Sequence, residues 1–437
     1  MLYRKNTKLF YILTIIGLVF FSSCFGSRKP RKTTENNTYK PPTQRPRVDK
    51  PRPTNPRTVN NPKTDNKPLP TLTQEYDIAL LLPFNTPINN LSYENDSIDE
   101  KSVMALEFYE GVMIGLEELK NKGFQANVYV YDTEKKKEKV KNILSQSQFK
   151  EMDLVIGPVY NKPLEEAHSF SKKNKVNLVS PLSPTTKFVE ENPYYLNVNQ
   201  SIFTHASYMY DHIAKEGHKN IVVIHRGNKS DQKNADIFKS FAGGGKSGVE
   251  HIGMLVEELV FMDPSQEILE TYLQRGRENI IVVPSFNEPF ANDIVRRLNS
   301  FSERYDITLY GMPSWDEFES LNIEYLEHLN LHITSNFYKD MSKSKAVQFE
   351  QVYRANLNNL PSEYACKGYD VVKYFGKMLE RKNEEKELTE TLRYSNETFG
   401  GFHFVPVLNP ETGEVDFFEN QKLYMLKFEN YQFRKVN

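Results

Sequence analysis

The sequence predicts an α/β protein with two lobes in tandem, each built on a mainly parallel, doubly wound sheet. Three observations lead to this fold class. Short β-branched or leucine-rich runs alternate with longer runs that have apolar residues at three- and four-residue steps, as strands alternate with helices. The strand-like runs stop at proline, glycine or polar residues. A first series of such elements begins at Tyr76, and a second begins near Tyr195.

The clearest unit of strand, helix and strand lies between Asp153 and Phe188. Its first strand ends at Gly157-Pro158, an amphipathic helix follows, and its second strand ends at Ser180-Pro181. Ligands of open α/β sheets bind outside the carboxyl ends of the strands. The loops after these two strands are therefore candidate binding segments.

The other elements follow from the same patterns. Before the central unit we expect a strand at 76–82, a helix at 102–120, a strand at 126–132 and a helix at 135–149. After it we expect helices at 202–216, 265–275 and 288–302, with strands at 220–225, 254–261, 280–284 and 307–310. A strand at 331–337, a long helical stretch at 343–381 and strand-like runs near 402–405 and 422–428 complete the chain. We therefore assign 75–199 plus 334–384 to lobe 1, and 200–333 plus 385–437 to lobe 2.

Residues 1–23 have the features of a signal peptide. Three Lys or Arg residues precede an uncharged, almost wholly apolar run of thirteen residues at 9–21. At about 1.5 Å per residue this run is too short for a hydrocarbon core about 30 Å thick. The serines before Cys24 resemble a bacterial lipobox, which implies that Cys24 is lipidated and becomes the first residue of the mature protein. The alternative is an ordinary secretory signal with an incidental cysteine.

Residues 24–74 predict a disordered, basic, Pro-rich tether. Ten of the 24 prolines lie between 30 and 70, and residues 28–70 carry a net charge of +9. The tether is a spacer, or its charge also holds it to anionic headgroups or wall polymer. Residues 71–437 carry a net charge of about −13, which argues against nucleic-acid binding by the folded part. The second cysteine, Cys366, fits a buried helix thiol.

Several segments, in order over most of 76–430, resemble the type I periplasmic binding-protein fold. The nearest branch is the branched-chain amino-acid receptors of ABC importers. The resemblance implies two lobes joined by three crossovers, a ligand held between them, and hinge closure on binding. It rests on Phe108–Leu119, Lys122-Gly123, Val128–Glu134, Ile156–Pro158, Val179–Pro181 and Tyr364–Asp370.

The resemblance also indicates where a ligand would lie. In those receptors a serine often stands at the position of Asn161, and a hydroxyl and an amide at the positions of Ser183 and Pro184 hold the ligand carboxylate. Pro184 has no N–H to donate. A Tyr-Gly pair of the family is replaced here by Arg226-Gly-Asn228-Lys229. These departures point away from an α-amino acid as the ligand.

The candidate ligand-binding residues come from both lobes. Lobe 1 supplies Pro83, Asn85, Asn161, Ser183 and Thr185. Lobe 2 supplies Asn228, Ser285, Asn287 and Trp315. For Trp315, the only tryptophan, packing in the core is the alternative to a place in the wall of the site.

Other motifs do not indicate chemistry. The Ala242–Ser247 segment lacks the first glycine of a phosphate loop, because Ser240 stands there. His328 and His332 lack the rest of a zinc motif, so we expect no metal and no cofactor. Asn409–Gly413 fits a hairpin turn. No nucleophile has a placeable His–Asp partner, so we expect no enzyme.

These observations lead to two functional hypotheses. The first is a lipid-anchored extracytoplasmic solute-binding protein that captures a small polar ligand for ABC-type transport or sensing, with a membrane permease as its partner. The alternative is a tethered envelope scaffold that regulates a peptidoglycan synthase and binds no small molecule, as some lipoproteins with a similar fold do. In a cell with two membranes, we expect the anchor in the outer membrane and the folded part in the periplasm.

Overall fold

The computed structural model describes residues 75–87, 98–215, 217, 219–242, 255–261, 266–382, 387–393, 395 and 399–436. The expected signal peptide, the lipidated Cys24, the tether and residues 243–247 lie outside the described residues. The described residues fall within one compact unit, 68–437. None of the helices in these ranges is long and apolar enough to cross a membrane.

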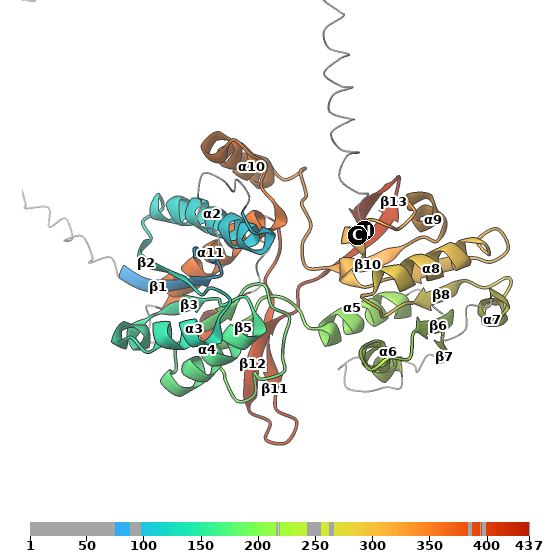
Figure 1. Cartoon of the computed structure of the whole chain (residues 1–437), viewed down its shortest axis with the longest axis horizontal. Coiled ribbons are helices and arrows are strands. Elements are labelled where there is room, and N and C mark those ends of the chain that lie inside the picture. Colours follow the sequence, from blue (N-terminus) through green and yellow to red (C-terminus); the bar gives the residue numbers. More distant parts are fainter. Residues whose placement is uncertain are drawn as a thin grey trace, which may run out of the picture. The chain divides into compact units, whose positions relative to one another are not determined.

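Two seven-stranded sheets form the two lobes (Figure 1). The first sheet has the order β11 (Phe404–Leu408), β12 (Val415–Asn420), β5 (Tyr195–Asn197), β4 (Leu178–Ser180), β3 (Leu154–Ile156), β1 (Glu75–Leu82), β2 (Gln125–Asp132). The second has the order β14 (Gln432–Lys435), β13 (Tyr424–Glu429), β10 (His332–Ser335), β9 (Ile307–Tyr310), β8 (Asn279–Val282), β6 (Asn220–His225), β7 (Val256–Val260). Consecutive pairs are parallel except β11–β12, β10–β13 and β13–β14. The predicted α/β class is confirmed, with antiparallel strands at one edge of each sheet.

Helices cover both faces of the first sheet (Figure 1). On one face, α2 (Glu100–Lys120) and α11 (Glu363–Lys382) pack on Ile78, Leu80 and Leu82 of β1. On the other, α3 (Lys137–Leu144) and α4 (Asn161–Asn174) pack on Ala79 and Leu81. Side chains of a strand alternate between faces, so β1 is apolar from Ile78 to Leu82, where both of its faces are buried.

The second sheet is built in the same way. On one face lie α5 (Ile202–Ala214) and α6 (Lys229–Ala242), which pack on Ile221 and Val223. On the other lie α7 (Gln266–Thr271), α8 (Glu288–Asn299) and α9 (Ile323–His328), which belong to the cluster around Val222 and Ile224.

Helices α2 and α11 touch through their backbones. A Cβ atom added to Gly111 would lie 1.8 Å from the carbonyl oxygen of Ala365, and one added to Gly368 would lie 2.1 Å from that of Phe108. Each helix therefore offers a glycine to the other, and no larger residue fits at either position without separating them.

Three crossovers connect the lobes, as the resemblance implies: β5 to α5, β10 to α10 (Ser344–Leu357), and β12 to β13. Glu419 of β12 is buried beside the first of them. Its carboxylate accepts hydrogen bonds from the Ser201 N–H at 2.6 Å and from the Thr204 hydroxyl at 2.8 Å. A strand of the first sheet is thus tied to the amino end of α5 in the second lobe.

The structure differs from the sequence-based expectation in the last hundred residues. The helical stretch expected at 343–381 is two helices, because Asn358 adopts a left-handed conformation (φ 53°) and Pro361 follows. The two strand-like runs are four strands in two hairpins, and Asn409–Gly413 forms the turn of the first, as predicted. The assignment of 385–437 to lobe 2 is wrong for β11 and β12, because these strands pair with the first sheet. Cys366 is buried, as expected.

Candidate functional site

In both lobes candidate residues lie at the point where the order of strands reverses, and Ser183, Thr185 and Trp315 follow the next strand of the sheet, β4 or β9. In the first sheet, β1 is followed by a helix on one face and β3 by a helix on the other. In the second sheet the same is true of β6 and β8, which are followed by α6 and α8 on opposite faces. The loops after such a strand pair diverge and leave a crevice, which is where open α/β sheets bind ligands.

The loop after β1 is fastened to the end of β2. The Asp132 carboxylate accepts hydrogen bonds from the N–H groups of Asn85 (3.0 Å), Thr86 (2.8 Å) and Glu134 (2.9 Å). Burial alone would raise the pKa of Asp132, but these bonds hold it below its usual value. Asn85 is buried, and its amide donates to Ser102 Oγ at 3.1 Å. Pro83 is buried as well, so both residues shape the loop rather than face solvent.

The loops after β3 and β4 meet through a pair of predicted residues. Gly157 (φ 91°) begins the first loop, and a Cβ atom there would lie 2.2 Å from the carbonyl oxygen of Leu81. The Ser183 hydroxyl donates to Asn161 Oδ1 at 2.8 Å, and the Thr185 N–H donates to Ser183 Oγ at 3.4 Å. Ser183 is buried and Asn161 is exposed, so the Asn161 amide N–H groups are the donors that this pair presents.

In the second lobe, Trp315 belongs to the core. It is 1% exposed, and its indole N–H donates to the carbonyl oxygen of Ser285 at 3.0 Å. Its ring lies against Gly311, where a Cβ atom would be only 2.5 Å away. Of the two roles considered for Trp315, the structure supports core packing, and the side chain acts by holding the loop after β8.

That loop ends in a helix cap. Ser285 is buried, and Asn287, which is half-buried, accepts a hydrogen bond from the Phe290 N–H on its Oδ1 at 3.0 Å. Between them, Phe286 is 44% exposed. A large apolar side chain thus faces solvent at the carboxyl end of a buried strand.

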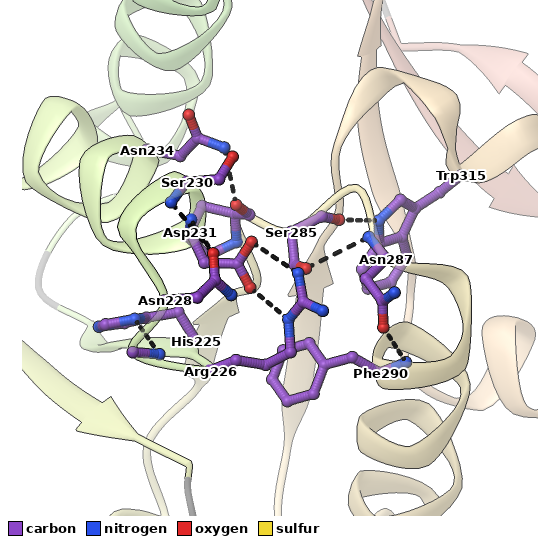
Figure 2. A network of polar contacts seen from close by, with 12 residues as sticks. His225, Arg226, Asn228, Ser230, Asp231, Asn234, Ser285, Asn287, Phe290 and Trp315 are labelled. Carbon is purple, nitrogen blue, oxygen red and sulfur yellow. Dashed lines mark hydrogen bonds and ion pairs between the residues drawn. The ribbon is translucent and has the colours of Figure 1, made fainter.

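A charged residue that was not among the candidates lies at the end of β6. Arg226 donates from Nε and Nη2 to the Asp231 carboxylate at 2.7 and 3.0 Å, and its guanidinium carbon lies 5.7 Å from the centre of the Phe290 ring (Figure 2). Burial would raise the pKa of Asp231, but hydrogen bonds from Arg226 and Ser285 lower it. Asp231 is 2% exposed, whereas the Arg226 side chain is 34% exposed.

Neighbouring contacts fix the turn that carries Arg226. His225 accepts the Gly227 N–H on Nδ1 at 3.1 Å, and its Nε2 lies 2.9 Å from Glu258 Oε1. One tautomer, with the proton on Nε2, satisfies both contacts. Asn228 is exposed, and its Oδ1 caps α6 by accepting the N–H groups of Ser230 and Asp231 at 3.0 and 3.1 Å.

The described part of the chain offers no metal centre, because no group of three or more His, Cys, Asp or Glu residues in it could hold an ion. The donors that remain at the strand ends are amides, hydroxyls and one guanidinium. Such groups can bind and orient a polar solute. Nothing in this arrangement activates a nucleophile.

The fold is the type I periplasmic binding-protein fold, in agreement with the resemblance in the sequence. A putative branched-chain amino acid ABC transporter protein from Rhodospirillum rubrum is similar over 83% of this chain and 100% of that one, with a TM-score of 0.62 and 16% identity. An ABC transporter substrate-binding protein from Desulfitobacterium hafniense in complex with Leu has the same coverage, a TM-score of 0.54 and 17% identity. A branched-chain amino acid ABC transporter periplasmic ligand-binding protein from Burkholderia xenovorans covers 83% and 94%, at 0.54 and 12%. No family model and no curated protein match the sequence.

Proposed function

We propose that this chain is an extracytoplasmic solute-binding protein, which captures a small polar ligand between its two lobes and delivers it to an ABC-type permease or a sensor. The observation that carries the proposal is the matching position of the polar residues in the two sheets. In each lobe they follow the two strands at which the strand order reverses, or the next strand along the sheet, β4 or β9. The known structures of similar fold, described as substrate-binding or periplasmic ligand-binding proteins, support a non-catalytic role.

In this proposal each lobe contributes polar side chains to the ligand site. Asn161 and Thr185 present polar groups from the first lobe, and Ser183 holds Asn161 in place. Asn228 and Asn287 present amide donors from the second, because their side-chain oxygens cap helices. Pro83, Asn85, Ser285 and Trp315 are buried and support the loops from beneath.

The test is the thermal unfolding of the purified full chain in the presence of amino acids, carboxylates, sugars, nucleosides and wall fragments. A ligand at a hundred times its Kd should add about 2.7 kcal/mol to the free energy of unfolding, a shift of several degrees. One solute that shifts the transition, and loses that effect in Asn161→Ala but not in Asn174→Ala, supports the proposal. Asn174 is a matched control, since it ends the same helix far from the strand ends.

Attachment to the membrane through a lipid on Cys24 is a further part of the proposal, and it rests on the sequence. Cells that express the protein with labelled palmitate should incorporate the label into the wild type and into Cys366→Ala, but not into Cys24→Ser. If Cys24→Ser is labelled as strongly as the wild type, or if none of the three proteins is labelled, Cys24 is incidental to an ordinary export signal. Separation of inner and outer membranes then locates the anchor.

The alternative function, a tethered regulator of an envelope enzyme such as a peptidoglycan synthase, is favoured by one surface. A groove of about 1050 Å³ lies beside α2 and the edge strand β2, lined by apolar side chains that include Met113 and Leu116. Met113 is exposed. If no solute stabilises the protein, and Met113→Glu abolishes its activation of a peptidoglycan synthase in a coupled assay, the regulatory function is supported and the solute-binding function is not.

A further inference from the structure

We propose that the ligand of this protein is a small organic anion, and that Arg226 is its charged anchor in the second lobe. The inference rests on the proposed solute-binding function and names the class of solute. Arg226 is the first residue after β6, and the loop after β8 lies beside it across the point of strand reversal. Arg226 is the one charged residue of the loop 226–228 between β6 and α6.

The guanidinium is held in one place. Asp231, from the first turn of α6, pairs with Nε and Nη2, and Phe290, from the first turn of α8, lies under the planar group. These two helices cover opposite faces of the sheet, so together they aim the side chain along the crevice between them. A planar group fixed in this way loses little conformational freedom when it binds a second partner.

Part of the guanidinium remains available. Nη1 has no hydrogen-bond partner among the residues that the structure describes, and Figure 2 shows it directed away from Asp231. An arginine can bind one carboxylate along its Nε side and a second at its Nη1–Nη2 end. Asp231 uses the first of these edges, and the second is partly exposed to solvent.

The groups around Nη1 are donors. Asn228 and Asn287 both use their side-chain oxygens to cap helices, which leaves their amide N–H groups for a ligand. Two carboxylates at the start of α6 and α8 are already bound, Asp231 by Arg226 and Glu288 by the Ser320 N–H at 2.8 Å. The amino ends of α6 and α8 add partial positive charge to the same place. This arrangement complements an anion and offers little to a cation.

The exposed Phe286 adds an apolar surface in the loop after β8, next to Asn287. A carboxylate with a hydrocarbon body would place its charge on Arg226 and its apolar part on that ring. The crevice therefore favours a monocarboxylate of moderate size over an inorganic anion or a sugar.

The experiment uses the full chain and matched pairs of probes: propionate, isovalerate and phenylacetate, each with its primary amide, and glucose and adenosine as neutral solutes. Calorimetric titration should give binding of at least one carboxylate and at least tenfold weaker binding of its amide. Arg226→Gln should weaken that binding about 10- to 100-fold, the effect of losing one hydrogen bond to a charged group. Arg304→Gln is the matched control, because Arg304 also pairs with a carboxylate (Glu270, 2.7 Å) and lies 5.3 Å from an aromatic ring, at the other end of α8.

Each remaining outcome counts against a defined part of the argument. Equal binding of acids and amides, or full binding by Arg226→Gln, overturns the anion anchor and leaves the receptor function in place. Binding of glucose or adenosine with no binding of carboxylates does the same. If no probe binds at all, the receptor function and the anchor both fail. Should Arg226→Gln not fold because Asp231 is left unpaired, the double variant Arg226→Gln, Asp231→Asn removes the buried charge and gives the same comparison.

Discussion

Replacing Gly111 with alanine tests whether α2 and α11 are held together by direct contact of their backbones. Helix propensity alone predicts that this change is favourable, by about 1 kcal/mol, because alanine is the better residue inside a helix. The contact predicts the opposite. The sign of the effect therefore distinguishes the two accounts.

The magnitude follows from the distances at the contact. The new Cβ atom would lie 1.8 Å from the Ala365 carbonyl oxygen and 2.7 Å from its carbon, where about 3.4 Å is the ordinary minimum. The obstacle is backbone, so the helices must separate by more than about 1 Å, and overpacking of this kind costs about 1–3 kcal/mol. Taking the upper value and subtracting the gain in propensity leaves a loss of about 2 kcal/mol. Gly115→Ala should cost less, because its nearest neighbour is the end of the Val372 side chain.

The assay is urea denaturation followed by circular dichroism, with Glu117→Ala on the exposed side of α2 as the control. Gly111→Ala should lower the midpoint with little change in slope, whereas the control should stay within about 0.5 kcal/mol of the wild type. The double variant Gly111→Ala, Gly368→Ala should lose less than the sum of the single losses, since one separation relieves both clashes. An unchanged or raised midpoint for Gly111→Ala would refute the contact.

Three further predictions concern buried polar groups. Trp315→Phe should lose about 1–3 kcal/mol in urea denaturation, because the buried Ser285 carbonyl is left without its donor, and an unchanged midpoint would contradict that bond. Burial lowers the pKa of His205 to about 3, so the folded protein keeps it neutral below the value near 6.5 of the unfolded chain. As the pH falls from 6.5 to 4, this group should lower the free energy of unfolding by up to about 1.4 kcal/mol per pH unit. The fall should therefore be steeper in the wild type and in His328→Gln than in His205→Gln, in which His168, whose pKa burial lowers to about 4, still contributes. Burial raises the pKa of Glu419 against the hydrogen bonds that lower it, so its contribution to stability falls as the pH rises through that pKa. Glu419→Gln should therefore gain stability relative to the wild type as the pH rises above the ordinary glutamate value of 4.5, and a constant difference from pH 4 to 8 would disprove this.

The local order of elements could be predicted because each one leaves a pattern within a few residues. The apolar run before Pro83 and the strand before Gly157-Pro158 are visible without any tertiary information. The break near Asn358 was missed because apolar spacing continues on both sides of it, although Pro361 was a signal. The sheet to which β11 and β12 belong could not be predicted, since the sequence pattern of a strand does not indicate which strand it pairs with.

The candidate site was predicted at the level of loops more than of side chains. The rule that ligands bind beyond the carboxyl ends of strands selected the loops after the strands as candidates, and the structure brings Asn161 and Ser183 of two such loops together. It could not tell that Trp315 turns into the core. Arg226 was noted as a departure from the family and not as a site residue, because its orientation depends on Asp231 and Phe290, which lie on two different helices. A basic residue directly after a buried strand was the available signal.

The return of the chain to the first lobe sets the order in which the molecule can be assembled. The parallel strands of the second sheet come from one continuous stretch, 220–335, whereas the first sheet and its covering helices need residues 75–197, α11 and the hairpin that ends at Asn420. Contacts between residues so far apart in sequence form late, after the intervening chain has been made. The parallel strands of the second sheet are therefore complete before the lobe that is synthesised first receives α11 and its hairpin, and β13 and β14 join the second sheet at the very end. Until α11 and the hairpin have been made, the apolar faces of β1, α2 and β2 stay exposed to solvent. The first hundred residues of the folded region are therefore the segment most prone to aggregate during synthesis.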